Sequence, residues 1–125
     1  VIRDWSSDVC SSDLVLGNDV GCPWITQYDF WRELFYFHKY VGVSNAFALY
    51  TATARAAEMA GIGAETGTIE PGKSADLIVT AENPLEDLRA LRKVEMVVTQ
   101  GRKIDHPQVK INPVVAAELD QFLVE

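Results

Sequence analysis

Apolar side chains recur at helical spacing in the first third of the chain. Four of them follow one another at intervals of three or four residues: Phe30, Leu34, Phe37 and Val41. This spacing places them on one face of a helix. Asp29, directly before the run, is a typical helix N-cap, and Gly42, directly after it, is a typical helix stop. The pattern therefore predicts an amphipathic helix between Asp29 and Gly42.

A second helical run follows, and it is apolar on most sides. Ser44 provides an N-cap for the stretch NAFALYTATARAAEMA, which stops at Gly61. A helix that is apolar over most of its circumference is normally buried between neighbours. We therefore expect this helix to lie inside a larger packed unit.

From Gly67 onward the pattern changes to short strands and turns. The stretch GTIEPGKSADLIVT predicts two short strands on either side of residues 70–73, where Pro71 and Gly72 form the centre of a type II turn. The stretch NPLEDL predicts a turn that leads into a short helical segment. The stretch KVEMVVTQGRKI predicts a hairpin about Gln100 and Gly101.

Shorter signals lie at the two ends of this region. Val15 and Leu16 are apolar and lead into a polar loop, which is typical of the tail of a strand. Asn112 and Pro113 predict the start of a helix. Three apolar residues fall on one face of that helix: Val115, Leu119 and Phe122.

Composition narrows the class of protein. The chain has 125 residues, is 48% hydrophobic and carries a net charge of -7. This apolar content is ample for a core, and the acidic balance argues against a nucleic-acid partner, which favours a basic face. No apolar run approaches the roughly 18 residues that a membrane-spanning helix needs. Cys10 and Cys22 are few for a secreted disulfide scaffold, so we expect free thiols rather than a pair.

The stretch RDWSSDVCSSDL, residues 3–14, has neither a helical nor a strand period. Its back-translation resembles an adapter oligonucleotide of short-read sequencing libraries, read in one frame. We therefore predict that residues 1–14 are not native sequence, and they are excluded from the predicted fold. A native N-terminus without regular structure is the alternative.

Several motifs together resemble the C-terminal end of metal-dependent amidohydrolases, above all the imidazolonepropionase and Xaa-Pro dipeptidase type. In chain order they are LGNDVG, ATARAAEMAGI, GTIEPGKSADLIV, NPLEDL and VVTQGRKI. The resemblance runs from Val15 to Ile104 and implies an α/β fold, namely the last strand stub and helices of a (β/α)₈ TIM barrel plus part of a small β-sandwich composite domain. It divides the chain into the end of the barrel (15–62), part of the sandwich (63–107) and a C-terminal helix (108–125).

The same resemblance implies a chemistry. These enzymes cleave an amide, peptide or cyclic amide C–N bond with a metal-activated water. Asp19 of the LGNDVG motif matches the family's aspartate after the eighth barrel strand, which binds the metal, usually zinc, and shuttles a proton. A carboxylate beside a metal ion suits both tasks. Taken without the surrounding motifs, an aspartate in this context is more often a turn residue.

The other metal ligands of such a site are not found in the sequence. His38 and His106 do not match the family's ligand positions, and one carboxylate does not make a zinc site of three or four protein ligands. We expect one or two divalent ions in a longer parent enzyme. For this chain alone we expect neither activity nor retained metal.

Other reactive side chains are better explained by structure. Cys22 lacks the basic neighbour that would make it a nucleophile. Trp24 is a candidate for substrate contact, whereas Trp31 fits core packing at least as well. Lys73 and Asp76 are predicted to fix the turn and strand around them rather than to form an acid–base pair.

Two hypotheses therefore stand. In the first, the chain is the C-terminal piece of an amidohydrolase that acts on a small-molecule or dipeptide-like substrate, with a cytoplasmic location favoured and homo-oligomer formation left open. In the second, it is a complete, non-enzymatic α+β binding module in which Asp19 is a turn residue.

Overall fold

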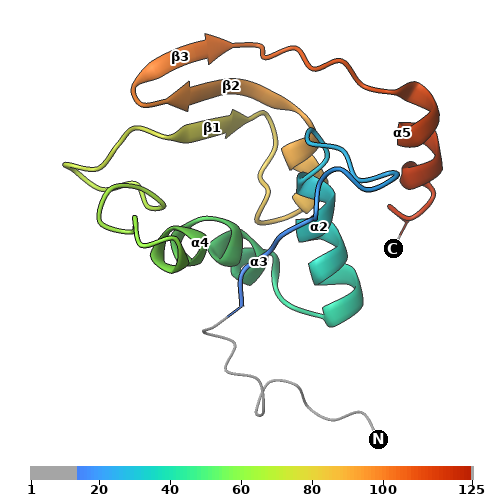
Figure 1. The fold of residues 1–125 in the computed structure, drawn as a ribbon, viewed down its shortest axis with the longest axis horizontal. Helices are drawn as coiled ribbons and strands as arrows, with labels where there is room; N and C mark the ends of the chain where they lie inside the picture. Colours follow the sequence, from blue (N-terminus) through green and yellow to red (C-terminus); the bar gives the residue numbers. More distant parts are fainter. Residues whose placement is uncertain (1–13, 125) are drawn as a thin grey trace, which may run out of the picture.

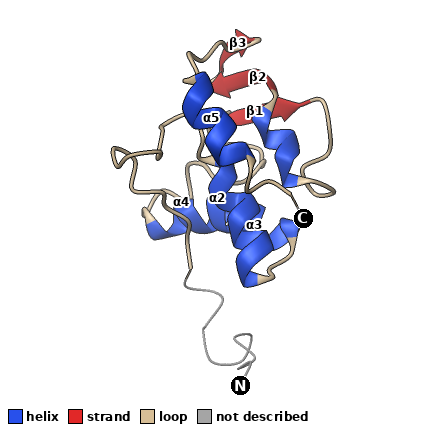
Figure 2. Ribbon diagram, turned by 90° about the vertical axis from the view of Figure 1, so that its right-hand side faces the viewer, coloured by secondary structure: helices blue, strands red, loops and turns tan. Residues whose placement is uncertain are grey.

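A small antiparallel sheet lies above a layer of helices (Figures 1 and 2). The computed structural model describes residues 14–124. Cys10 and the predicted non-native stretch, apart from Leu14, lie outside the described residues. In chain order, the elements are α2 (Trp31–Tyr36), the π-helical turn η2 (Phe37–Val41), α3 (Asn45–Ala52), α4 (Ala54–Met59), β1 (Leu77–Thr80), the 3₁₀ helix η3 (Leu88–Arg92), β2 (Val94–Thr99), β3 (Arg102–Asp105) and α5 (Pro113–Asp120).

The first predicted helix is present, but its start and its last turn differ from the prediction. Gly42 ends it as predicted, with a left-handed φ of 81° and its N–H bonded to the carbonyl of His38. The predicted N-cap is wrong, because Phe30 occupies the cap position and the Asp29 carboxylate binds side chains instead. The predicted place of Val41 on the apolar face of this helix is also wrong. The π-helical turn shifts the last residues out of the 3.6-residue period, so Val41 is exposed.

The second predicted helix begins and ends where expected but is broken in the middle. The Ser44 hydroxyl caps α3 by accepting from the N–H of Phe47, and Gly61 follows the end of α4 with a φ of 76°. Between the two helices, Thr53 leaves helical geometry. Its hydroxyl donates to the carbonyl of Leu49 at 2.7 Å, a local bond that competes with helical geometry.

The predicted burial of this run on most sides is only partly confirmed. Ala48, Thr51 and Ala57 are buried, whereas Tyr50 and Met59 are exposed. One side of the helical pair therefore packs within residues 14–124, and the other side faces outward.

The sheet has the order β1-β2-β3, with both pairs antiparallel. The predicted hairpin is confirmed, because Gln100 and Gly101 both take positive φ values (49° and 76°), as a type I′ turn requires. The turn at residues 70–73 is also confirmed, with φ of 92° at Gly72 and the N–H of Lys73 bonded to the carbonyl of Glu70.

Two predicted strands do not form among residues 14–124. Thr68 and Ile69 lie outside any strand, and Ile69 is 87% exposed. Val15 and Leu16 are likewise without strand pairing. A strand needs a neighbour to satisfy its backbone groups, and the described part of the chain offers none to either segment.

The core joins the helices to η3. Its buried members are Leu34 and Phe35 of α2, Ala48 of α3 and Leu88 of η3. Trp31 is buried as well, which confirms its predicted packing role. Within residues 14–124 no helix has the length and apolar content to cross a membrane.

The loop between α4 and β1 folds back onto α4 at Gly67. A Cβ atom at this position would lie 2.5 Å from the Cβ of Ala57, and the φ of Gly67 is 93°. Only glycine permits both the conformation and the close approach. The loop is thus held against α4 at Gly67.

The predicted C-terminal helix is confirmed in α5. The Asn112 side chain accepts from the N–H of Val114 at 3.1 Å, and Pro113 is the first helical residue. The predicted position of Phe122 is wrong. The helix ends at Asp120, and Phe122 lies beyond it with an exposed side chain.

Candidate functional site

Asp19 lies in an exposed, tightly turned loop before α2. Its backbone has a left-handed φ of 49°, a conformation that aspartate tolerates better than most residues. Residues 22–25 form a turn closed by the N–H of Ile25 and the carbonyl of Cys22 at 3.1 Å. Pro23 and Trp24 occupy its centre, and Trp24 has a φ of 64° where a type II turn favours glycine. Two residues with a positive backbone φ, Asp19 and Trp24, thus lie close together in this loop.

The Asp19 carboxylate has a neighbour that sequence reasoning missed. The Cys22 thiol lies 3.6 Å from Oδ2 of Asp19 and can donate a weak hydrogen bond to it. Cys22 is free and exposed. Its i,i+3 separation from Asp19 in a loop with glycine and proline was the signal for this contact. The thiol is a partner of the candidate catalytic carboxylate.

The described residues do not assemble a metal centre. Across residues 14–124 no group of three or more His, Cys, Asp or Glu side chains is placed to hold an ion. His38 contacts the carbonyl of Val43 through Nδ1 at 2.7 Å, next to the turn that ends the first helix. The backbone N–H of His106 donates to the backbone carbonyl of Glu95 at the end of the hairpin. Among the described residues Asp19 does not form a metal site alone, and its role as a ligand stays a prediction.

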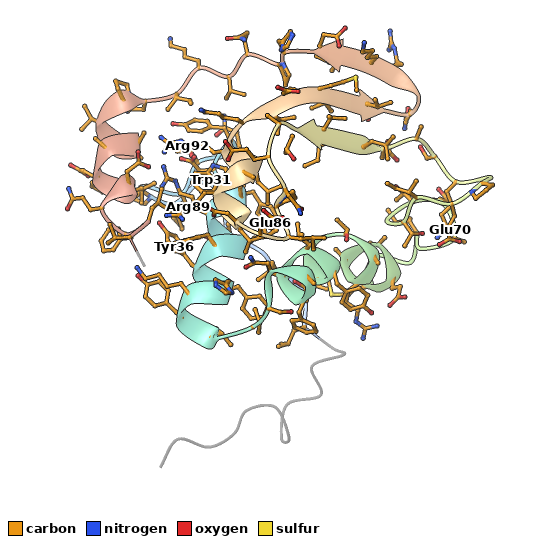
Figure 3. The ribbon with its side chains drawn as sticks, turned by 180° about the vertical axis from the view of Figure 1, so that it is seen from behind. Trp31, Tyr36, Glu70, Glu86, Arg89 and Arg92 are labelled. Carbon is orange, nitrogen blue, oxygen red and sulfur yellow. The ribbon has the colours of Figure 1, made fainter. Side chains whose placement is uncertain are left out.

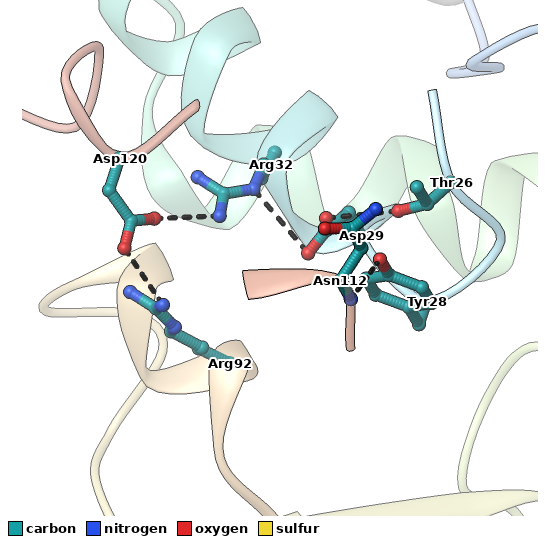
Figure 4. Close-up of polar contacts among 7 residues, drawn as sticks. All are labelled: Thr26, Tyr28, Asp29, Arg32, Arg92, Asn112 and Asp120. Carbon is teal, nitrogen blue, oxygen red and sulfur yellow. Dashed lines mark hydrogen bonds and ion pairs between the residues drawn. The ribbon is translucent and has the colours of Figure 1, made fainter. Parts of the chain in front are cut away.

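The loop that follows Asp19 is attached to α5. The Trp24 indole donates to the Glu118 carboxylate. The Tyr28 hydroxyl accepts from the N–H of Asn112 at 3.0 Å, directly before α5 (Figure 4). The predicted contact between Trp24 and substrate stays a prediction.

Arg32 forms the charged centre of this attachment. Its side chain is only 3% exposed and lies between Asp29 (Nε to Oδ1, 3.4 Å) and Asp120 (Nη2 to Oδ1, 2.7 Å). Arg92 of η3 binds the second oxygen of Asp120 at 2.9 Å (Figure 4). Asp120 therefore links α2, η3 and the end of α5. The sequence offered a signal only for the Asp29–Arg32 pair, at i,i+3.

These contacts shift the pKa values of Arg32 and Asp120. Burial alone would raise the pKa of Asp120, but the hydrogen bonds from Arg32 and Arg92 and the charges of both guanidinium groups together outweigh it and lower that pKa. Burial alone would lower the pKa of Arg32, but the hydrogen bond to Asp120 and the negative charges of Asp29 and Asp120 together outweigh it and raise that pKa. Each partner thus keeps the other ionised.

We expect the Asp120 contacts to make the free energy of unfolding depend on pH. Because the pKa of Asp120 is lower in the folded than in the unfolded chain, its contribution is complete above the ordinary carboxyl pKa of about 4 and is lost as the pH falls through the folded value. Its side chain is 35% exposed, so solvent screening limits the effect to about 1 kcal/mol.

The measurement is urea unfolding at pH 7 and at pH 3. Asp120→Asn should lower the free energy of unfolding at pH 7, and the difference from the parent chain should shrink at pH 3. Asp105→Asn is the control, because Asp105 pairs with Lys103 in the open, with both side chains 59% exposed. A constant difference at the two pH values would contradict the expectation.

Lys73 and Asp76 are placed as the structural interpretation requires. The Lys73 ammonium donates to the carbonyl of Gly63 at 2.8 Å and to the Thr68 hydroxyl at 2.6 Å. Asp76 accepts from the N–H of Gln100 at 2.8 Å, a bond that lowers its pKa. Lys73 thus stabilises the loop between α4 and β1, and Asp76 stabilises the hairpin turn at Gln100.

Comparisons with known proteins identify relatives of the chain. The sequence profile of the amidohydrolase family matches residues 8–104. A provisionally assigned prolidase from Bifidobacterium longum is 44% identical, with a TM-score of 0.83, over 86% of this chain and 26% of that chain. An Xaa-Pro dipeptidase with methionine bound in its active site is 34% identical, with a TM-score of 0.59, over 61% of this chain and 18% of that chain.

A prolidase complexed with N-methylphosphonate-L-proline is 33% identical, with a TM-score of 0.54, over 60% of this chain and 19% of that chain. No curated protein matches. The chain thus spans about a quarter, or less, of the length of the structures that it matches. The predicted resemblance is confirmed, and the chain belongs to the amidohydrolase family.

Proposed function

We propose that the chain is the C-terminal piece of a metal-dependent hydrolase that cleaves the C–N bond of an Xaa-Pro dipeptide or a similar amide. The observation that carries this proposal is the 44% identity and TM-score of 0.83 to the Bifidobacterium longum protein over 86% of the chain. The phosphonate-proline complex of a second relative supports a proline-containing substrate. The comparisons give no support to a complete, non-enzymatic module.

Asp19 is the residue of this chain that takes part in the chemistry. Its carboxylate is exposed, and its Oδ2 atom can accept a weak hydrogen bond from the Cys22 thiol. A carboxylate so placed can accept the proton of an attacking water and pass it to the leaving amine. When bound, a divalent metal, zinc in our proposal, lowers the pKa of such a water. Its further ligands would come from the longer parent chain.

The fold of the parent follows from the same proposal. Residues 15–62 would complete the end of a TIM barrel, with Val15 and Leu16 as the tail of its last strand. This supports the placement of Asp19, because catalytic residues of such barrels lie at the C-terminal ends of strands. Residues 63–107 would belong to the small sandwich, and residues 108–125 to the helix that braces the Asp19 loop.

A chimaera tests the proposal. Residues 15–125 replace the matching 26% of the Bifidobacterium longum relative, and hydrolysis of Ala-Pro and Met-Pro is measured beside Ala-Ala. We expect the chimaera to hydrolyse the proline dipeptides on which the unmodified relative is active. The relative truncated before the graft is the control and should be inactive. A folded chimaera without amide or peptide hydrolysis would overturn the proposal.

A further inference from the structure

A cavity of about 320 Å³ lies between the connection from β3 to α5 and the surfaces of α2 and η3. Most of its wall is apolar and is formed by Leu91, Val94, Pro107, Val109 and Ile111. Its size and lining suit a small organic molecule. Asp19 does not line this cavity.

Cationic side chains gather on one part of the wall. Arg32, Arg92 and Lys93 line the cavity, and Asp29 is the carboxylate among the lining residues. Asp120, from outside the lining, binds both arginines. Within residues 14–124 the Lys93 ammonium has no ion-pair partner. Three cations against two carboxylates leave one positive charge unbalanced, which favours a ligand with a single negative charge.

Arg32 has hydrogen-bonding capacity left over. Its Nε and Nη1 atoms are buried without a hydrogen-bond partner in the described part of the chain, although Nε lies within ion-pair distance of Asp29. These two atoms are buried and Tyr36 lies beside the guanidinium, so Arg32 acts on the cavity as a fixed positive charge. Arg92 has a side chain that is 42% exposed, and its remaining N–H groups can donate to the oxygens of a carboxylate.

Trp31 keeps the two guanidinium groups in place. The Cζ atoms of Arg32 and Arg92 lie 4.7 and 5.8 Å from the centre of its ring. Figure 3 shows Trp31 and Arg92 next to each other at this point of the fold. The cations are therefore oriented before any ligand arrives, which lowers the entropic cost of binding.

We propose that this cavity binds a small monocarboxylate with an apolar body. The carboxylate faces the Arg32, Arg92 and Lys93 group, and the body packs on Leu91 and Ile111. Inorganic phosphate and sulfate fit less well, because they have no apolar part to cover the wall. The inference rests on the lining of this cavity and does not depend on the hydrolase proposal.

Titration of the full 125-residue chain with benzoate tests the site, by calorimetry and by ligand-observed NMR. Benzamide is the matched neutral probe, because it has the same ring and nearly the same shape. We expect saturable binding of benzoate and at least about fivefold weaker binding of benzamide, since the charged hydrogen bonds are lost. The absence of saturable benzoate binding, or equal affinity for both probes, overturns the proposal.

Two single-residue variants locate the site. Lys93→Gln removes the unpaired cation, and Gln108→Glu adds a carboxylate to the lining while keeping the side chain's shape. Each should weaken benzoate binding by about fivefold. Lys103→Gln is the control on β3, where the lysine pairs with Asp105, and it should leave the affinity unchanged. Equal weakening by Lys103→Gln, or none by either lining variant, would place the anion elsewhere and overturn the proposal.

Discussion

Asp19→Asn in the chimaera is expected to lower kcat for Xaa-Pro hydrolysis by at least about a hundredfold, the usual scale of general acid–base catalysis. Asparagine keeps the size of the side chain and its oxygen acceptor for the Cys22 thiol, which lies 3.6 Å from the carboxylate. It cannot accept and return a proton at neutral pH. The loss should therefore appear in kcat, with a smaller change in KM.

The control for this prediction is Asp105→Asn, an equal loss of charge on β3. It should leave kcat unchanged within about twofold. Circular dichroism of both variants would exclude unfolding as the cause. If Asp19→Asn retained full activity in a folded chimaera, Asp19 would be a turn residue, as its positive φ also permits.

Leu88→Ala is expected to lower the free energy of unfolding of the chain by about 3 kcal/mol. Leu88 is 1% exposed and belongs to the core cluster with Leu34, Phe35 and Ala48. Removing its branched end leaves a cavity where η3 meets α2, because backbone elements on both sides restrict collapse. Such a loss is a large part of the stability of a small domain.

Urea unfolding followed by circular dichroism measures this effect. Leu85→Ala removes the same atoms from a side chain that is 57% exposed three residues earlier, and it is the matched control. We expect its unfolding midpoint to move by a small fraction of the Leu88→Ala shift. Equal midpoints for the two variants would show that the core cluster does not limit stability.

The parts of the fold that the sequence predicted are those that local chemistry determines. Ser44 caps a helix with its own hydroxyl, Gly42 ends one through its own φ, and Gln100 with Gly101 closes a hairpin. Each of these caps and turns depends on contacts within a few residues. The local sequence pattern was therefore enough to locate them.

The features that the sequence did not predict depend on partners that lie far away in the sequence or outside the described residues. Val15 and Leu16 have strand-forming side chains, but no strand pairs with them within residues 14–124. Arg32 binds Asp120, which lies 88 residues further along, and no local pattern could predict that pair. Asp19 was predicted as a site residue only through the surrounding motifs, because a single carboxylate has no periodic signature.

Gly67 has a consequence for how the sequence can change during evolution. Its contact with Ala57 pins the first half of the loop between α4 and β1, and the Lys73 bond to the carbonyl of Gly63 closes the second half. The exposed tip between these two anchors, residues 68–72, remains the place where homologues can gain or lose residues without moving the sheet. Insertions on the helix side of Gly67 would instead displace this residue from its contact with Ala57.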